Sequence, residues 1–412
     1  MAMLSEHVAP DLAAAIHAGG TVRGWNVAGF DVPVWNKIFP DCPIKPEQID
    51  DTMDRARVVG LPGKLDRAAQ FMGMQLRKDT EGHKLMMKLC KADNPYPDMQ
   101  ELLRLAEYCK RDVEVEARLA DMIPPLPDFE VYVRQLTHDI NRHGFEVDTQ
   151  LAVQALQFAE EERAELADRL TALTDGEVTR HTQRDRIFKW LAANGCKLPN
   201  LQKQTLEDAL NEDHIPVDAR EVIDIRLSGA KASTAKFQAA VNMACRDRRE
   251  RGTFVYFGAA TGRWSGRGIQ PHNLPRESAD DPDQVLEDIQ QGEVPAVYKA
   301  LSSLLRPLIV APAGHKLVRC DFSAIEGRVV AWLANDRPAL KEYAGAGKMY
   351  ERAAAGIYNV PMQAVTKPQR QIGKVAELAL GFQGGYKAFE SMAKNYGVKV
   401  PASEAKLIVK KW

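Results

Sequence analysis

The segment Pro124-Pro125-Leu126-Pro127 constrains the fold of this chain more than any other feature of its sequence. Proline fixes its own backbone and restricts the residue before it, so neither a helix nor a central strand runs through such a segment. A domain boundary is therefore predicted near residue 125. The sequence changes character again near residue 250, and 412 residues are enough for two or three domains. We expect domains at residues 1–125, 126–250 and 251–412.

The pattern of apolar residues predicts a different class of structure in each block. Residues 1–125 are typical of an α/β domain, with a strand at 21–27 and an amphipathic helix at 100–122. Residues 126–250 favour an elongated helical subdomain over a compact core. Residues 251–412 mix both kinds of element. The elements predicted in the last two blocks are helices at 150–173, 184–193, 205–210 and 220–246, strands at 253–257 and 316–320, and helices that start at Ala324 and Lys367.

The charges of this nearly neutral chain are segregated. Basic residues outnumber acidic ones in 226–276 and in 365–412, whereas 277–293 is acidic and contains no Lys or Arg. Two basic blocks are a candidate footprint for a polyanion, although two solvated surfaces remain an alternative. The six cysteines include no C-x-x-C pair, which disfavours a zinc knuckle or a disulfide framework. No stretch is long and apolar enough to span a membrane, and the N-terminus does not resemble a signal peptide.

The first motif, from Thr261 to Arg276, is rich in Gly, Arg and Pro and cannot form one helix. Its arginines suit phosphates and base edges. Gln270 and Asn273 can both donate and accept hydrogen bonds, as recognition in a minor groove requires. The motif indicates a nucleic-acid contact, and a basic surface loop stays open as the alternative.

The second motif, from Val318 to Arg328, is an apolar strand that ends on Asp321 and is followed at once by a helix. A carboxylate at the end of a strand is well placed to hold a metal ion at the edge of a sheet. The alternative is that Asp321 or Ser323 only caps the following helix.

The third motif is a stripe of residues four apart on one helix, formed by Arg370, Lys374, Leu378 and Phe382. The two cations lie toward the N-terminal end, where the helix dipole already favours anions. This order suits a nucleoside triphosphate, with its phosphates on the cations and a base pair against Phe382. An amphipathic helix with two exposed bases is the alternative.

In this order and spacing, the motifs resemble those of family A (DNA polymerase I-like) DNA polymerases, and their wording is similar to phage and prophage versions. The first resembles the T-G-R…Q-x-N-L-x-R segment between thumb and palm, the second resembles motif A, and the third resembles motif B of the fingers. The resemblance implies an α/β and α+β multidomain chain. Its parts would be a partial RNase H-like 3'-5' exonuclease domain at 1–125, a helical connector and thumb at 126–250, and an incomplete palm and fingers at 251–412.

The same resemblance implies a role for each matching residue. Asp321 would coordinate two catalytic Mg²⁺ ions, with the carbonyl of Phe322 on one of them. Glu326 would exclude a ribose 2'-hydroxyl, and Leu378 stands where an aromatic residue is usual. Arg370 and Lys374 would bind the incoming deoxynucleoside triphosphate, and Phe382 would pack on the nascent base pair. The residues implied to contact primer-template DNA are Lys231, Lys236, Arg263, Gln270, Asn273, Arg276 and Arg328.

The N-terminal block resembles a DEDD-type 3'-5' exonuclease. The segment from Asn26 to Asp31 is similar to the second motif of that family, and the segment from Tyr108 to Asp112 is similar to its third. The resemblance implies that Asp31 and Asp112 are metal ligands and that Tyr108 orients a water molecule. A surface tyrosine and aspartate are the alternative. No D-x-E motif precedes Asn26, so we expect this site to bind metal poorly.

No hairpin that carries a second catalytic aspartate, the family's motif C, follows the third motif before Trp412. We therefore expect no appreciable polymerase or exonuclease activity from these 412 residues alone. The resemblance implies template-directed DNA synthesis by a parent enzyme, a monomer in the bacterial cytoplasm encoded by a phage or prophage. A non-catalytic DNA-binding remnant of a prophage polymerase is the alternative.

Overall fold

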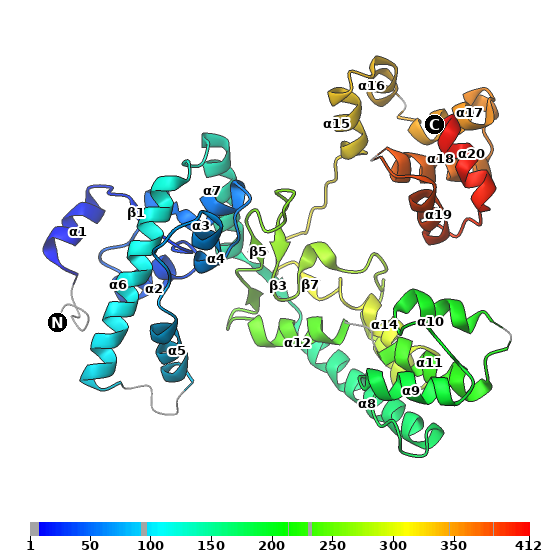
Figure 1. Ribbon diagram of the computed structural model, residues 1–412, viewed down its shortest axis with the longest axis horizontal. Coiled ribbons are helices and arrows are strands. Elements are labelled where there is room, and N and C mark those ends of the chain that lie inside the picture. Colours follow the sequence, from blue (N-terminus) through cyan, green and yellow to red (C-terminus); the bar gives the residue numbers. More distant parts are fainter. Residues whose placement is uncertain (1–7, 92–96, 213, 230–232, 346, 382) are drawn as a thin grey trace. The chain divides into compact units, whose positions relative to one another are not determined.

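The computed structural model describes residues 8–412 except 92–96, 213, 230–232, 346 and 382 (Figure 1). The chain divides into two compact units, Met1–Leu317 and Val318–Trp412. Each unit has buried apolar clusters of its own. Within the described part of the chain, no helix is both long enough and apolar enough to cross a lipid bilayer.

The N-terminal part of unit 1 surrounds a small parallel sheet of β1 (Val22–Gly24) and β2 (Ile49–Asp51). The strand predicted at 21–27 is confirmed in part. It ends at Gly24, and the chain then passes through Asn26 with a φ of 62°. The helix predicted at 100–122 is confirmed as α6 (Met99–Met122), which begins at a capping box of Asp98 and Glu101. The remaining elements are α1 (Pro10–His17), α2 (Asp31–Ile38), η2 (Pro46–Gln48), α3 (Thr52–Val58), α4 (Leu65–Phe71) and α5 (Thr80–Leu89).

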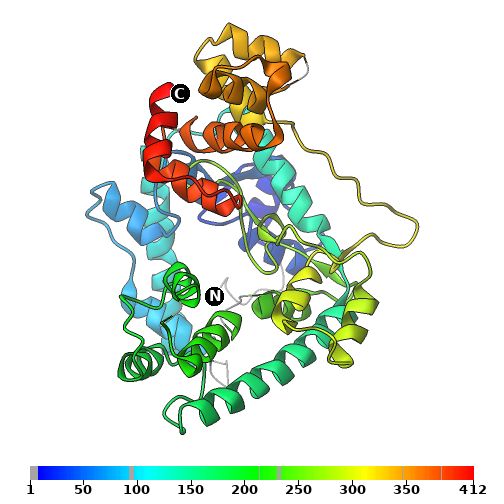
Figure 2. The same cartoon turned by 90° about the vertical axis from the view of Figure 1, so that its right-hand side faces the viewer.

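The middle of unit 1 is built along α8 (Thr149–Leu173), a helix that is about 37 Å long at 1.5 Å per residue. Helices α11, α12 and α14 contact it, as Figures 1 and 2 show. Predicted helices are confirmed as α8, α9 and α10, and the one predicted at 220–246 corresponds to α11 and α12 on either side of residues 230–232. The bounds are α7 (Asp128–His143), α9 (Arg184–Ala193), α10 (Lys203–Leu210), α11 (Val217–Gly229), α12 (Ser233–Met243), α13 (Pro282–Gln290) and α14 (Val297–Ser303).

This middle part has a continuous hydrophobic core, so the expectation of a subdomain without a compact core is wrong. Small residues on α8, Ala152, Ala155 and Ala159, are buried and allow other helices to approach closely. Because the outer faces of these helices carry many polar residues, the sequence pattern does not reveal the core. The core spans residues 151–309 and therefore crosses the predicted domain boundary at residue 250, which remains a prediction.

Unit 1 also contains two small antiparallel sheets of short strands. β3 (Phe145–Val147) lies between β4 (Arg249–Glu250) and β7 (Ile309–Val310) and is antiparallel to both. β5 (Phe254–Val255) pairs with β6 (Ser265–Gly266), which confirms the strand predicted at 253–257 in part. The segment 258–276 contains only β6 and η3 (Pro271–Asn273), as its glycines and prolines predict.

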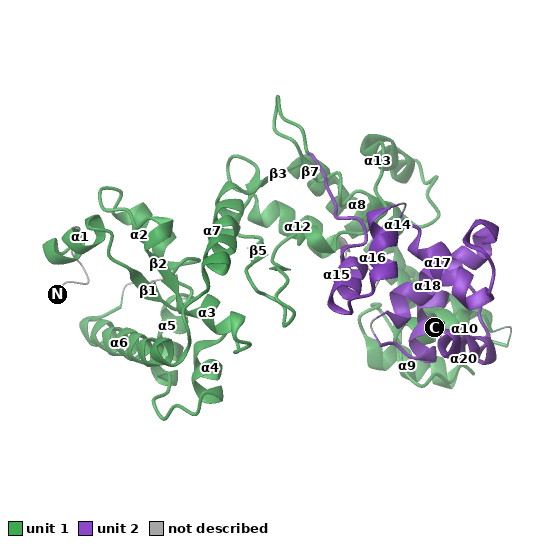
Figure 3. Ribbon diagram, turned by 90° about the horizontal axis from the view of Figure 1, so that it is seen from above, with its two compact units in different colours: residues 1–317 green, residues 318–412 purple. Residues whose placement is uncertain are grey.

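In the described part of unit 2, the regular elements are helices (Figure 3). The largest core of the unit packs α17 and α18 against α19 and α20. The helix predicted from Lys367 is α18, and it ends at Leu380 in a stretch that contains Gly381, Gly384 and Gly385. The bounds are α15 (Ile325–Leu333), α16 (Arg337–Ala344), α17 (Met349–Tyr358), η4 (Met362–Ala364), α18 (Lys367–Leu380), α19 (Tyr386–Asn395) and α20 (Ala402–Lys411).

The strand predicted at 316–320 is wrong, because this segment has no regular structure. Its apolar residues Leu317, Val318 and Cys320 favour a strand, but a strand needs a neighbour to accept and donate its backbone hydrogen bonds. No segment of the described chain pairs with it. The helix predicted from Ala324 is confirmed as α15, and Ala324 precedes it in a left-handed conformation with a φ of 50°.

Candidate nucleotide-binding site

The helix α18 carries the predicted stripe of cations and begins at a capping box. The side chain of Thr366 accepts a hydrogen bond from the backbone of Gln369, whose own side chain accepts one from the backbone of Thr366 at 2.9 Å. Arg370 and Lys374 follow within the first two turns. The helix dipole favours anions at this end.

A face of α18 that adjoins the stripe is packed against α17. Gly373 makes the close approach possible, because a Cβ atom there would overlap the carbonyl oxygen of Tyr350. Ile372, Val375 and Ala376 are buried beside it. Beside this packed face, Arg370 stays exposed and Lys374 is half-buried.

Both cations of the stripe contact side chains from other helices. The Nε of Arg370 donates to Glu351 on α17 at 2.8 Å, and its guanidinium lies 5.2 Å from the ring centroid of Tyr350. The Nζ of Lys374 lies 4.5 Å from the ring centroid of Tyr396 on α19. Phe382, the last predicted member of the stripe, lies outside the described residues.

The second motif and α18 meet at one cavity of about 720 Å³ within unit 2. Asp321, Phe322 and Glu326 line it from the start of α15, and Leu378 lines it from α18. Tyr350, which lies beneath Arg370, also lines this cavity. The structure thus brings together the predicted metal ligand, the predicted sugar-discriminating residue and the predicted nucleotide-binding helix.

Arg328, which was predicted to contact DNA, instead ties α15 to α16. Its guanidinium donates to the backbone carbonyls of Ser323 and Tyr343, each at 2.8 Å, and lies 5.0 Å from the ring centroid of Tyr343. These contacts satisfy the side chain within the protein. A structural role explains them without DNA.

The described residues do not supply a complete metal site. No group of three or more His, Cys, Asp or Glu side chains in the described ranges is arranged to hold an ion. Asp321 and the carbonyl of Phe322 are the predicted donors, and Asp321 is exposed. A two-metal site for phosphoryl transfer needs more oxygen ligands than these.

The first motif in unit 1 presents polar side chains on a short, anchored loop. Arg263, Asn273 and Arg276 are exposed, and the amide of Asn273 donates to Gln270 at 3.4 Å. Lys236 donates instead to the backbone carbonyl of Ile269 at 2.8 Å, so it fastens α12 to this loop. Lys231, the other predicted thumb lysine, lies outside the described residues.

Glu250 also anchors this loop, through a hydrogen bond to its backbone. It is fully buried and accepts a hydrogen bond from the backbone of Ile269 at 3.0 Å. Burial raises the pKa of its carboxyl, and the nearby Lys236 partly offsets that rise. Gly268 has a φ of 62°, and a Cβ atom there would overlap the Glu250 side chain. Sequence reasoning missed this carboxylate, because nothing in the sequence marks an acid inside a basic block as buried.

The predicted exonuclease residues are only partly brought together. Tyr108 and Asp112 lie one turn apart on α6, and Lys78 approaches both. Its Nζ is 3.0 Å from the Asp112 carboxylate and 5.4 Å from the centroid of the Tyr108 ring. Asp31 is exposed at the start of α2, and no described contact joins it to this pair. Asp112 is thus paired with a cation of the chain itself.

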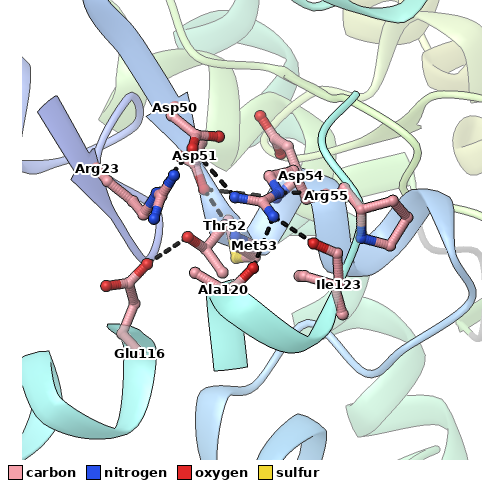
Figure 4. A network of polar contacts seen from close by, with 11 residues as sticks. Arg23, Asp50, Asp51, Thr52, Met53, Asp54, Arg55, Glu116, Ala120 and Ile123 are labelled. Carbon is pink, nitrogen blue, oxygen red and sulfur yellow. Dashed lines mark hydrogen bonds and ion pairs between the residues drawn. The ribbon is translucent and has the colours of Figure 1, made fainter. Parts of the chain in front are cut away.

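A buried polar network that the sequence did not reveal joins β2, α3 and α6 (Figure 4). Arg55 donates to Asp50 at 3.0 Å and to the carbonyls of Ala120 and Ile123. Asp51 caps α3 and also accepts from the backbone of Ala28 at 3.1 Å.

A second link in this network joins α3 directly to α6. The hydroxyl of Thr52 donates to Glu116. The available signal was the run Asp50-Asp51-Thr52, which is a favoured start for a helix. The network fixes the backbone that leads to Asp31.

Comparisons with known proteins show the family to which the chain belongs. The chain is 34% identical to the DNA polymerase of Bacillus phage SP02, a match that covers 89% of this chain and 60% of the relative. It is 29% identical to DNA polymerase I of Pseudomonas aeruginosa over 36% of this chain and 14% of that protein. The chain therefore spans about 60% of the length of its phage relative.

A solved structure shows the same fold at low sequence identity. It is the POL domain of Pol1 from M. smegmatis, in complex with DNA primer-template and dNTP, and it matches with a TM-score of 0.54 at 16% identity. The match covers 88% of this chain and 58% of that one. The family model for DNA polymerase family A matches residues 181–412, which is more than half of the chain. The chain belongs to DNA polymerase family A.

Proposed function

We propose that this chain serves template-directed DNA synthesis, the transfer of a deoxynucleotide to a primer 3'-hydroxyl in replication or repair. The observation that carries the proposal is the cavity lined by Asp321, Glu326 and Leu378, on whose helix Arg370 and Lys374 also lie. In this arrangement the cations bind the triphosphate at the N-terminal end of α18, and the sugar lies toward Glu326 and Leu378. Phe382 would pack against the base pair.

Direct measurement of nucleotide binding tests this proposal. A deoxynucleoside triphosphate titrated into the 412-residue chain should bind, and Arg370→Ala and Lys374→Ala should each weaken binding. Since each variant removes one charged contact to phosphate, we expect a loss of about tenfold or more. Unchanged affinity in both variants would contradict the placement of the triphosphate.

We propose that primer-template DNA is the second partner and that it contacts the loop of the first motif. Arg263, Gln270, Asn273 and Arg276 are its candidate contacts, and support comes from the exposure of Arg263, Asn273 and Arg276 and from the basic character of the segment. The solved structure with the same fold has DNA primer-template bound. Affinity for a fluorescent primer-template should fall steeply as salt rises. Binding that is indifferent to salt would refute an electrostatic contact.

We further propose that these 412 residues have little polymerase activity by themselves. A divalent ion such as Mg²⁺ would neutralise charge on the phosphates, but Asp321 and the carbonyl of Phe322 are only part of the donor set it needs. Primer extension with Mg²⁺ or Mn²⁺ is the test, with Asp321→Asn as the matched control. Robust incorporation that Asp321→Asn abolishes would show that the donor set is sufficient.

The N-terminal domain is proposed to be an exonuclease-like domain with a weak metal site. Its support is the pairing of Tyr108 with Asp112 on one face of α6, and Lys78 already compensates that carboxylate. Degradation of a single-stranded 3' end should therefore be slow. We also propose a monomeric protein of the bacterial cytoplasm, encoded by a phage or prophage. A DNA-binding remnant without catalysis is the competing function, and it predicts DNA binding without nucleotide binding.

A further inference from the structure

Glu351 is a residue outside the nucleotide-binding motif that contacts the motif directly. It lies in the first turn of α17, and its Oε1 accepts a hydrogen bond from the Nε of Arg370 at 2.8 Å. The side chain of Arg370 keeps 45% of its surface exposed, against 23% for Glu351. The carboxylate therefore binds the Nε side of the guanidinium, and the rest of the arginine side chain remains accessible to solvent and ligands.

Tyr350, the preceding residue, supports the same guanidinium from a second direction. Its ring centroid lies 5.2 Å from the guanidinium carbon, a distance at which a cation is attracted to the face of an aromatic ring. The backbone of Tyr350 is held against Gly373 of α18. The position of Glu351 relative to Arg370 is thus set by the packing of two helices rather than by a mobile loop.

We propose that Glu351 is the positioning residue of Arg370 and fixes its guanidinium for the phosphates of the incoming nucleotide. This inference rests on the proposed function, in which Arg370 binds the triphosphate. An arginine side chain has many rotamers, and binding an anion requires it to adopt one. A hydrogen bond to Nε leaves the two terminal nitrogens of the guanidinium for the ligand, which is the geometry that suits phosphate.

The negative charge of Glu351 works in the opposite direction, since it repels a triphosphate. That charge is present at neutral pH. Burial opposes ionisation, but the hydrogen bond from Arg370, a backbone hydrogen bond and the nearby positive charges together outweigh it and lower the pKa of Glu351 below its ordinary value. The ion pair with Arg370 compensates the charge locally, and salt screens what remains at this partly exposed site. We infer that positioning outweighs repulsion.

Two conservative variants separate the hydrogen bond from the charge. Glu351→Gln keeps an oxygen that accepts from Nε and removes the charge. Glu351→Asp keeps the charge, but its side chain is one methylene shorter and loses the contact. Calorimetric titration of the full chain with inorganic tripolyphosphate and with dGTP measures both. Glu404→Ala removes a charge from the exposed surface of α20 and serves as the control.

We expect Glu351→Asp to bind both probes about three- to tenfold more weakly and Glu351→Gln to bind within about twofold of the parent chain. Thermal unfolding of each variant checks that unit 2 is folded. Tighter binding by Glu351→Gln together with unchanged binding by Glu351→Asp would overturn the inference, because the charge alone would then matter. Equal losses in both variants would overturn it too.

The proposed function fails separately from this inference. If Arg370→Ala leaves the affinity for tripolyphosphate unchanged, Arg370 does not bind phosphate, and the proposed function is wrong whatever the Glu351 variants do. If Arg370→Ala weakens binding and Glu351→Asp does not, the nucleotide site stands and the positioning role of Glu351 is refuted.

Discussion

Asp54 should make the stability of the N-terminal domain depend on pH. Its side chain is buried on α3, and burial together with the charge of Asp51 raises its pKa from 3.8 to about 7 against the opposing charges of Arg57 and Arg134. A folded-state pKa above the unfolded value means that the folded protein holds the proton more tightly. The stability contributed by this proton is complete below pH 3.8 and is lost as the pH rises toward 7.

The expected loss between pH 5 and pH 8 follows from the shift. Between pH 5 and the folded-state pKa of about 7, the pH rises by about two units while the folded protein still holds the proton. This interval corresponds to a loss of about 3 kcal/mol of unfolding free energy. Asp54→Asn cannot ionise and should abolish this loss, while Asp280→Asn in an exposed loop should retain it. Comparison of variants at each pH cancels the contribution of His138, whose pKa burial lowers to about 4.

Urea denaturation at pH 5 and pH 8 measures the effect, and hydrogen exchange of the segment 49–60 assigns it to α3. The unfolding free energy of Asp54→Asn should change less with pH than that of the parent chain. If the two proteins lose the same stability between pH 5 and pH 8, Asp54 does not hold a proton in the folded state, and the reasoning is refuted.

Three further predictions concern packing. Gly373→Ala should destabilise unit 2 by about 1–3 kcal/mol through overlap with the α17 backbone, whereas Gly356→Ala, which meets open space, should stabilise it by up to about 1 kcal/mol; calorimetry measures both. Arg55→Met should cost about 3–5 kcal/mol in urea unfolding, because it leaves buried carbonyl oxygens at the end of α6 without a donor, and a cost below about 1 kcal/mol would contradict this. Leu119→Ala should cost about 2–5 kcal/mol by the same measurement, whereas the exposed Leu12→Ala should cost far less.

Local signals were enough to predict most helices of this protein. The capping box at Thr366 and the richness of α8 in Ala, Leu and Glu are readable in the sequence, and both helices begin within one or two residues of the predicted position. The predicted strand at 316–320 failed because strand formation depends on a neighbour that no local pattern reveals. The compact core along α8 was not predicted, for a related reason: buried alanines do not stand out in a helix that is otherwise polar.

For the candidate site too, local spacing was predictable from the sequence, whereas tertiary contacts were not. The spacing of Arg370, Lys374 and Leu378 predicts one helical face, but only Leu378 of the three lines the cavity with Asp321 and Glu326. The DNA contact of Arg328 stays a prediction, and the sequence did not reveal that its guanidinium donates to backbone carbonyls of the protein itself. The buried acids Asp51 and Glu250 were missed because their hydrogen-bond donors are backbone N–H groups, which no sequence pattern marks.

The contacts of Arg370 and Lys374 show which part of the site a sequence motif does not contain. A motif records which residues touch the ligand, but Glu351 and Tyr396 come from other helices, and only tertiary packing brings them to the cations. Each cation must be ordered before it can bind phosphate well, and a long side chain on a helix surface does not order itself. The strength of nucleotide binding in this chain therefore depends on α17 and α19 as much as on the helix that carries the motif. Substitutions at those supporting positions should change affinity while the motif itself stays intact.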